Sequence, residues 1–300
     1  MGRNGWAALA AVLLAAGCAT ANQAPWAEQR LCRSEKIWRA QVTPQGWLEF
    51  LLKGFDPRTR RATSPALDCS GEQVIWPGAG LACVDSALAR TSLPERELGD
   101  EDVVVSQISP EIVLVWIATT RYASGEAMGP VALVDVAGRE VVVRAKGVLR
   151  AFPTRARLRL EQAGGSEWLA AEGERCAPDA PASCERAARL LRLAGDRFLP
   201  ETFATAEGRC VSPGVVHLLR RESEALPSGW RRTKELTAQL TFAPAGVQVQ
   251  ELLTIRDADP RQPQTPPRLY RRAEGDWTVS LQDGRAVASG GSVWERMSQF

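Results

Sequence analysis

Polar and apolar residues alternate along most of the chain after residue 36, and the alternation breaks at short runs rich in Gly, Pro and Asp. A period of two is typical of β-strands with one buried face. The clearest example is Glu235–Phe242, whose four apolar residues occupy every second position before Ala243–Gly246 turns the chain. Further hairpin turns are predicted at Gln162–Ser166, Ala194–Asp196 and Gln282–Gly284. The pattern therefore predicts antiparallel β structure.

Three segments depart from the period of two. Ile112–Ala118 is an uninterrupted apolar run, which suits a central strand buried on both faces. Cys83–Arg90 and Val293–Gln299 are the best candidates for helices, and both are short. The expected fold class is mainly β, an antiparallel meander that forms a sandwich, an open barrel or propeller-like sheets, stapled by disulfides and with few short helices.

Composition marks the domain boundaries only weakly. Thr91–Asp102 is acidic and is the best candidate for a linker between two units. We divide the chain into a signal peptide at 1–17, a tether at 18–35, an N-terminal β unit at 36–100 and a main antiparallel β region at 101–300. One domain after the tether is the alternative.

The first twenty residues carry the pattern of an export signal. Arg3 gives a positive start, Gly5–Ala16 is uncharged and mostly apolar, and the small residues Ala15–Gly17 precede Cys18. The apolar core is too short to span a bilayer. Its ending, LLAAGC, resembles the lipobox of bacterial lipoproteins. The resemblance implies cleavage before Cys18 and attachment of acyl chains such as palmitate to this residue.

The lipobox resemblance also implies a location. Ala19, rather than Asp, follows the cysteine, and this suggests an outer-membrane lipoprotein that faces the periplasm or the cell surface. The alternative is an ordinary signal peptide cut after Ala21, which would release a soluble periplasmic protein. No later apolar stretch approaches the length of a membrane-spanning helix, so the expected membrane contact is the N-terminal lipid anchor.

Both processing routes leave six cysteines in the mature chain, and an even number in an exported protein predicts disulfides. Cys176 and Cys184 flank a short Pro-containing loop, and we predict that they pair. Three pairings remain open for the other four, which are Cys32, Cys69, Cys83 and Cys210. Because the chain has no Cys-x-x-Cys motif and one histidine, we predict no metal site and no cofactor.

His217 is the only histidine, and it lies within the apolar stretch Val215–Leu219. A catalytic triad or dyad built on imidazole would need this residue. Its apolar neighbours predict a partly buried strand histidine rather than a catalytic base. The chain also contains no nucleophile, metalloprotease or phosphate-binding motif. We therefore name no catalytic residue, although the many carboxylates leave a hydrolase open.

The net charge of +2, from 37 basic and 35 acidic residues, favours neither acidic nor basic partners. Six cations, however, lie near one another on two successive predicted strands: Arg144, Lys146, Arg150, Arg155, Arg157 and Arg159. Pairing of these strands through a turn near Phe152 would put them on one sheet face. Such a face suits an anionic glycan, a lipid head group or an acidic protein. The alternative is a solvated face with acidic neighbours.

These features predict a lipid-anchored cell-envelope protein with a non-catalytic binding or scaffolding role. A periplasm-facing hydrolase and a binder of an anionic glycan or lipid head group are the alternatives. Export makes nucleic acid an unexpected partner. A deep pocket with converging acids would favour the hydrolase, and a continuous cationic face would favour the anion binder.

Overall fold

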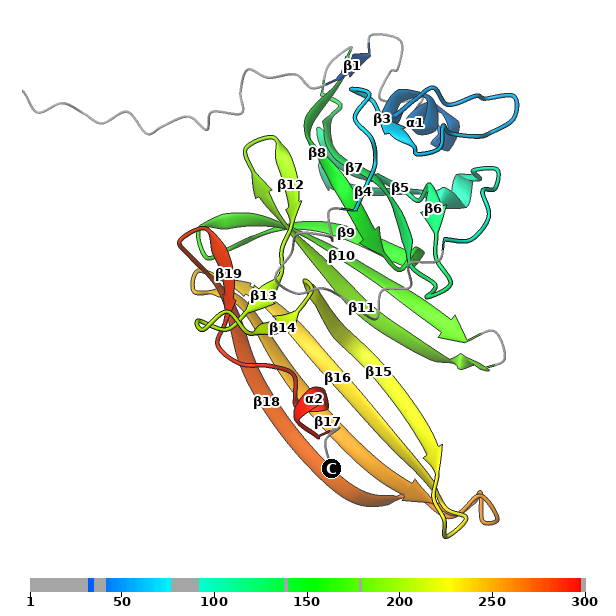
Figure 1. Ribbon diagram of the computed structural model, residues 1–300, viewed down its shortest axis with the longest axis vertical. Helices are drawn as coiled ribbons and strands as arrows, with labels where there is room; N and C mark the ends of the chain where they lie inside the picture. Colours follow the sequence, from blue (N-terminus) through cyan, green and yellow to red (C-terminus); the bar gives the residue numbers. More distant parts are fainter. Residues whose placement is uncertain (1–31, 35–41, 77–91, 138–139, 178–179, 298–300) are drawn as a thin grey trace, which may run out of the picture.

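The computed structural model describes residues 32–34, 42–76, 92–137, 140–177 and 180–297 (Figure 1). The described chain is mainly β, as the sequence predicts. The helices are α1 (Pro44–Leu51) and α2 (Val293–Met297), and a 3-10 turn covers Asp100–Asp102. The strands are β1 (Arg33–Ser34), β2 (Leu52–Lys53), β3 (Leu67–Asp68), β4 (Val103–Ser109), β5 (Ile112–Ile117), β6 (Thr120–Arg121), β7 (Ala127–Asp135), β8 (Val141–Ala151), β9 (Thr154–Ala163), β10 (Ser166–Ala177), β11 (Ala180–Ala194), β12 (Arg197–Pro200), β13 (Phe203–Ala204), β14 (Cys210–Ser212), β15 (Val215–Ala225), β16 (Arg231–Ala243), β17 (Gly246–Ala258), β18 (Arg268–Gln282) and β19 (Arg285–Ala288).

One large mixed sheet runs through the molecule, and most of its strand pairs are antiparallel. β9, β10, β11, β15, β16, β17, β18 and β19 follow one another as antiparallel neighbours. On the side away from β10, β11 has two partners: Arg186–Arg189 pairs with β15, and Leu191–Ala194 pairs with β12. β12 in turn runs parallel to β8, which continues through β7 and β5 to β4. The hairpins that the sequence predicts at β9–β10, β11–β12, β16–β17 and β18–β19 are confirmed.

The upper part of the molecule is a two-layer sandwich (Figure 1). Leu114 and Trp116 of β5 pack in the core that β5, β7 and β8 share with β9, β10 and β11. The alternate residues Val113, Val115 and Ile117 of the same strand point into a second core on the other side. β5 is therefore buried on both faces, as its uninterrupted apolar sequence predicts.

The N-terminal unit packs on the outer face of this sandwich. Thr43 caps α1 by accepting a hydrogen bond from the Gly46 amide at 3.2 Å, and Pro44 occupies the first turn, where a proline costs no helical hydrogen bond. Trp47, Leu48 and Leu51 of the helix are buried against β5, β7 and β8. This unit was expected to be β, but between residues 42 and 76 it holds one helix and two short strands. The helix expected at Cys83–Arg90 lies outside the described residues.

The lower part is a curved sheet formed by the long strands β15 to β18 (Figure 1). One end of its inner face is filled by an apolar core that includes Phe203, Leu218 and Trp277. α2 covers the middle of this face with Val293 and Trp294 (Figure 1). The helix begins at Val293, where the sequence predicts a C-terminal helix. Gly275 of β18 allows this close approach, since a Cβ at that position would lie 2.3 Å from Val293 Cγ1.

Two disulfides have both partners in the described chain. Cys176 is bonded to Cys184 across the β10–β11 hairpin, and Cys32 is bonded to Cys69. Cys210 is disulfide-bonded as well, while Cys83 lies outside the described residues. Disulfides persist in oxidising compartments, so the protein belongs in an extracytoplasmic environment. None of the described helices has the length and hydropathy needed to cross a bilayer.

Candidate functional site

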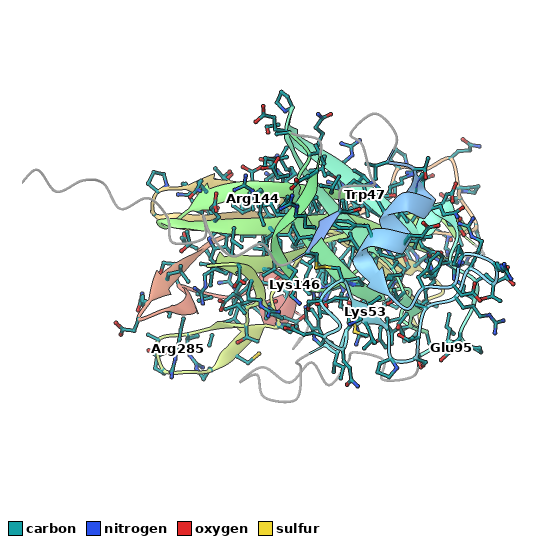
Figure 2. All side chains as sticks on the ribbon, turned by 90° about the horizontal axis from the view of Figure 1, so that it is seen from above. Trp47, Lys53, Glu95, Arg144, Lys146 and Arg285 are labelled. Carbon is teal, nitrogen blue, oxygen red and sulfur yellow. A yellow bond between two sulfur atoms is a disulfide. The ribbon has the colours of Figure 1, made fainter. Side chains whose placement is uncertain are left out.

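The six cations expected to share one face are divided between the two layers of the sandwich. β8 pairs with β7, and β9 pairs with β10, so the chain at Phe152 passes from one layer to the other instead of forming a hairpin. Arg144 and Lys146 of β8 also differ in depth, with side chains that are 36 % and 3 % exposed (Figure 2). The continuous six-cation face is therefore not formed.

The arginines of β9 have acidic neighbours on β10. Arg155 Nη1 lies 3.2 Å from Glu174 Oε2, and Arg159 forms ion pairs with Glu161 and Glu172. Arg157 is exposed directly opposite Glu172 in the strand register. This arrangement is the solvated, charge-balanced face that stood as the alternative interpretation of these residues.

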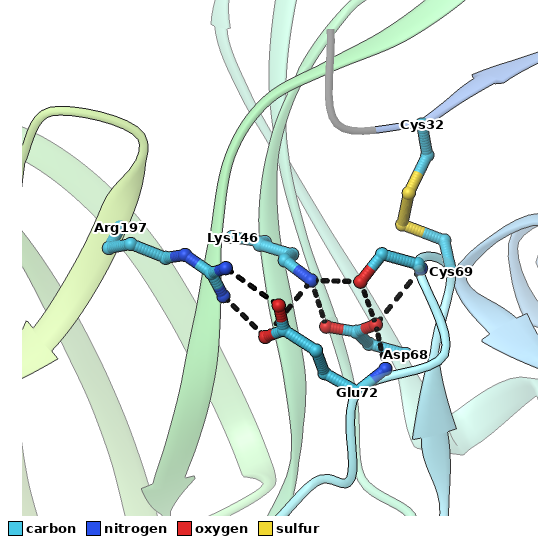
Figure 3. Close-up of a disulfide and its surroundings, with 7 residues drawn as sticks. Cys32, Asp68, Cys69, Glu72, Lys146 and Arg197 are labelled. Atoms are coloured by element: carbon cyan, nitrogen blue, oxygen red, sulfur yellow. Dashed lines mark hydrogen bonds and ion pairs between the residues drawn. A yellow bond between two sulfur atoms is a disulfide. The ribbon is translucent and has the colours of Figure 1, made fainter. Parts of the chain in front are cut away.

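Lys146 is buried in a salt-bridge network that joins the N-terminal unit to the sandwich (Figure 3). Its Nζ lies 2.6 Å from Asp68 Oδ2 and 3.2 Å from Glu72 Oε2. Glu72 also accepts hydrogen bonds of 2.6 and 2.7 Å from the guanidinium of Arg197. The Cys32–Cys69 disulfide adjoins Asp68, so this region is cross-linked both covalently and ionically. All four charges are matched, which indicates a structural role.

A cavity lies where β11 meets β15, beside α2, and has a volume of about 490 Å³. This volume falls within the range of pockets that bind small molecules. Its apolar walls include Phe152, Val215, Trp277 and Trp294, and its polar walls include His217 and Glu251. The cavity therefore has the mixed lining typical of a site for an amphipathic molecule.

The pairing of β11 with β15 explains why a cavity forms between these strands. Ala187 of β11 pairs with His217 of β15, and Arg186 pairs with Leu219, so that β15 has one extra residue, a β-bulge, at Leu218. Among the described residues, the pairing of the two strands ends at Leu219. β15 then continues as a partner of β16 alone, from Arg220 to Ala225. A bulge bends its strand and increases the local twist. The two strands consequently diverge, and the cavity lies beside the last paired residues.

Each arginine that lines the cavity forms an ion pair with a glutamate. Arg220 Nη2 lies 2.7 Å from Glu222 Oε1, and Arg175 forms an ion pair with Glu185. Deeper in the wall, Glu126 bridges two buried guanidiniums, at 2.8 Å from Arg150 and 3.1 Å from Arg189. Glu251 is also buried, and its carboxylate accepts a hydrogen bond of 2.7 Å from the Val293 amide of α2. The lining holds five glutamates and three arginines, so the site has an excess of carboxylates and no unpaired arginine among the described residues.

Two buried polar atoms of the cavity residues have no hydrogen-bond partner in the described chain: Nδ1 of His217 and Nε1 of Trp277. Burial lowers the pKa of His217 to about 4, with further contributions from the positive charges of Arg220, Arg175 and Arg189. The imidazole is therefore neutral near pH 7. Both atoms are shielded from the cavity as well as from bulk water, so the free-energy cost of each missing hydrogen bond is borne by the fold.

The geometry at His217 favours binding over nucleophilic catalysis. A catalytic histidine is normally held by a hydrogen bond from its Nδ1 to a carboxylate or carbonyl, and this atom has no such partner among the described residues. The hydroxyl of Ser212, which also lines the cavity, instead donates to the Val215 carbonyl at 2.5 Å. That His217 is not a catalytic base remains a prediction.

A further cluster, formed by Glu174, Cys176 and Cys184, has ligand-type atoms within 4.8 Å of one another. The two sulfurs are joined in a disulfide and are not thiolates, so they are unsuited to bind a metal ion.

Sequence reasoning singled out His217 but missed the cavity around it. Its walls come from β11, β15, β18 and α2, which are far apart in the chain. The one signal in the sequence that could have indicated the cavity was the isolated histidine in an apolar strand, because a buried polar side chain requires partners from elsewhere in the fold. No family model, curated protein sequence or solved structure matches the chain.

Proposed function

We propose that this protein is a lipid-anchored envelope protein with a non-catalytic binding role, and that the cavity beside His217 holds a small, uncharged, amphipathic molecule. The observation that carries the proposal is a cavity of about 490 Å³ whose lining combines the apolar surfaces of Phe152, Val215 and Trp294 with the neutral imidazole of His217. An anionic ligand would meet an excess of carboxylates in such a site, whereas a neutral ligand adds no charge to it.

The required ligand chemistry follows from the lining. The neutral imidazole of His217 offers an acceptor or a donor at the cavity wall according to its tautomer. Phe152 and Val215 supply apolar contact area. The ligand class that fits is therefore a neutral molecule with an apolar body and at least one hydroxyl, amine or amide group.

The envelope location of the proposal is supported by the lipobox-like ending at Cys18 and by the disulfides of the folded domain. Acylation of Cys18 would fix the protein at the outer membrane, with the folded domain beside it. A role in holding or presenting a small amphipathic molecule is compatible with that position.

Binding of N-phenyl-1-naphthylamine tests the cavity, because this dye is uncharged, carries one N–H group and becomes fluorescent in apolar surroundings. We expect saturable fluorescence with the wild type. Val215→Trp, which enlarges a partly exposed wall residue, should abolish it. Val105→Trp is the matched control, since Val105 is 46 % exposed on β4, away from the cavity. Equal dye binding by both variants would refute a ligand site at this position.

A further inference from the structure

The ends of the four long strands at the lower extremity of the molecule form a region of positive charge, which we call the distal tip. It comprises residues 222–234 and 255–272, and therefore the β15–β16 and β17–β18 connections (Figure 1). These residues include eight Lys and Arg and four Asp and Glu, a net charge of +4, while the whole chain carries +2. The rest of the chain is consequently net negative, at −2.

Several arginines of the distal tip form no ion pair with an acidic residue of the described chain. Arg232 is held by Asp257 through two hydrogen bonds of 2.8 and 2.9 Å. In contrast, four exposed arginines make no ion pair with any described residue: Arg231, Arg256, Arg268 and Arg271. This distinguishes the tip from the β9 arginines, two of which are paired with glutamates.

Apolar side chains are exposed among these charges. Leu269 and Tyr270, which lie between Arg268 and Arg271 in β18, are 55 % and 59 % exposed. The Tyr270 ring also stacks on the guanidinium of Arg232, with the carbon of that group 3.8 Å from the ring centroid. An aromatic ring beside cations, with an aliphatic side chain exposed next to it, is the composition of surfaces that enter the headgroup region of a bilayer.

Protection of a sheet edge explains only part of this composition. β19 pairs with β18 only at Val279–Gln282, so the described chain leaves the earlier part of β18 as an edge, where charges prevent aggregation. Arg231 and Arg256, however, lie on β16 and β17, and each of these strands is paired on both sides. The exposed side chains of Leu269 and Tyr270 would also weaken the protection of this edge, because apolar groups on an unpaired strand promote association with other chains.

We propose that the distal tip docks onto a bilayer that contains anionic lipids. The unpaired arginines contact lipid phosphates, and Leu269 and Tyr270 enter the interface between headgroups and acyl chains. An acidic protein or glycan would satisfy the charges without using the exposed apolar pair. The tip lies at the opposite end of the long axis from β1, so a protein held by its N-terminal segment presents the tip to a second surface (Figure 1).

Capture of vesicles by immobilised protein tests this surface. The full-length protein is held on a sensor through a peptide tag inserted before Cys32, and vesicles of neutral lipid or of four parts neutral to one part anionic lipid are passed over it. We expect capture of the anionic vesicles only, with loss of capture at high salt. Exchanging Arg231, Arg256, Arg268 and Arg271 for Gln should weaken capture at least about tenfold.

The control removes the same charge elsewhere. It exchanges four exposed arginines outside the tip that have no side-chain ion pair with described residues, namely Arg58, Arg157, Arg209 and Arg285, for Gln. A second test variant, Leu269→Ser with Tyr270→Ser, should weaken capture at unchanged charge. Thermal unfolding verifies that each variant is folded. The proposal is overturned if wild-type protein captures no anionic vesicles, or if the tip and control charge variants capture them equally.

Discussion

The single histidine allows one pH effect to be isolated from all others. The pKa of His217 is lowered from 6.5 to about 4, chiefly because its imidazole is removed from water and then because Arg220 lies nearby. The positive charges of Arg175 and Arg189 act in the same direction, whereas the negative charge of Glu126 opposes them. In the unfolded chain the imidazole should titrate near its ordinary value.

The sign of the effect on stability follows from proton binding. Between pH 6.5 and about 4 the unfolded chain binds a proton at this residue and the folded chain does not. The free energy of unfolding therefore decreases as the pH falls through that window, and the contribution becomes constant below about pH 4. At about 1.4 kcal/mol per pH unit, the loss between pH 7 and pH 4.5 is on the order of 2 kcal/mol.

Comparison of the wild type with His217→Gln measures this contribution, because carboxylates affect both proteins equally. Urea unfolding at pH 7 and pH 4.5 should show a loss of stability that is about 2 kcal/mol greater in the wild type. In a proton NMR titration, the chemical shift of the single imidazole should likewise remain that of the neutral form down to pH 5. Equal pH dependence of the two proteins, or a titration midpoint near 6.5, would show that the site is not desolvated as described.

Three other substitutions test structural roles. Lys146→Met should reduce the free energy of urea unfolding by about 3 kcal/mol, because it leaves the largely buried Asp68 carboxylate without its ion-pair partner, while Arg144→Met on the same strand should cost under about 1 kcal/mol; equal losses would contradict the difference in burial. Cys18→Ser should move the protein from the membrane to the soluble fraction, and a wild type already in the soluble fraction would exclude the lipid anchor. Exchanging the three β9 arginines for Gln should change stability by under about 1 kcal/mol, as thermal unfolding can measure.

Much of the β architecture could be predicted because its signals are local. The alternation of Glu235–Phe242 lies within β16, and the apolar run Ile112–Ala118 contains the doubly buried β5. The pairing of Cys176 with Cys184 joins residues brought together by a hairpin. α1 also had a local signal, since Thr43 followed by a proline is typical of a helix start, but the segment lies in the range assigned from the sequence to an N-terminal β unit.

The candidate site depended on non-local pairing that the sequence does not encode in any one segment. Predicted strands that follow one another usually pair, and the six-cation face rested on that expectation. β8 and β9 instead belong to opposite layers, and Glu172 and Glu174 arrive on β10 beside the β9 arginines. The cavity forms because β11 and β15 diverge after Arg186. This divergence depends on a β-bulge and on the pairing of β11 with β12.

The Cys32–Cys69 disulfide fixes residue 32 covalently to the folded body, and it therefore limits how far from a membrane that body can operate. If Cys18 carries the lipid, 14 residue steps separate the anchor from the covalently fixed Cys32. A fully extended chain spans at most about 3.5 Å per residue, so this leash reaches no further than ~50 Å. Each residue added or removed before Cys32 changes the maximum working height by ~3.5 Å. The length of the segment between Cys18 and Cys32 thus sets this height. Shortening the segment would move the folded body towards its own membrane and the distal tip away from any opposing membrane.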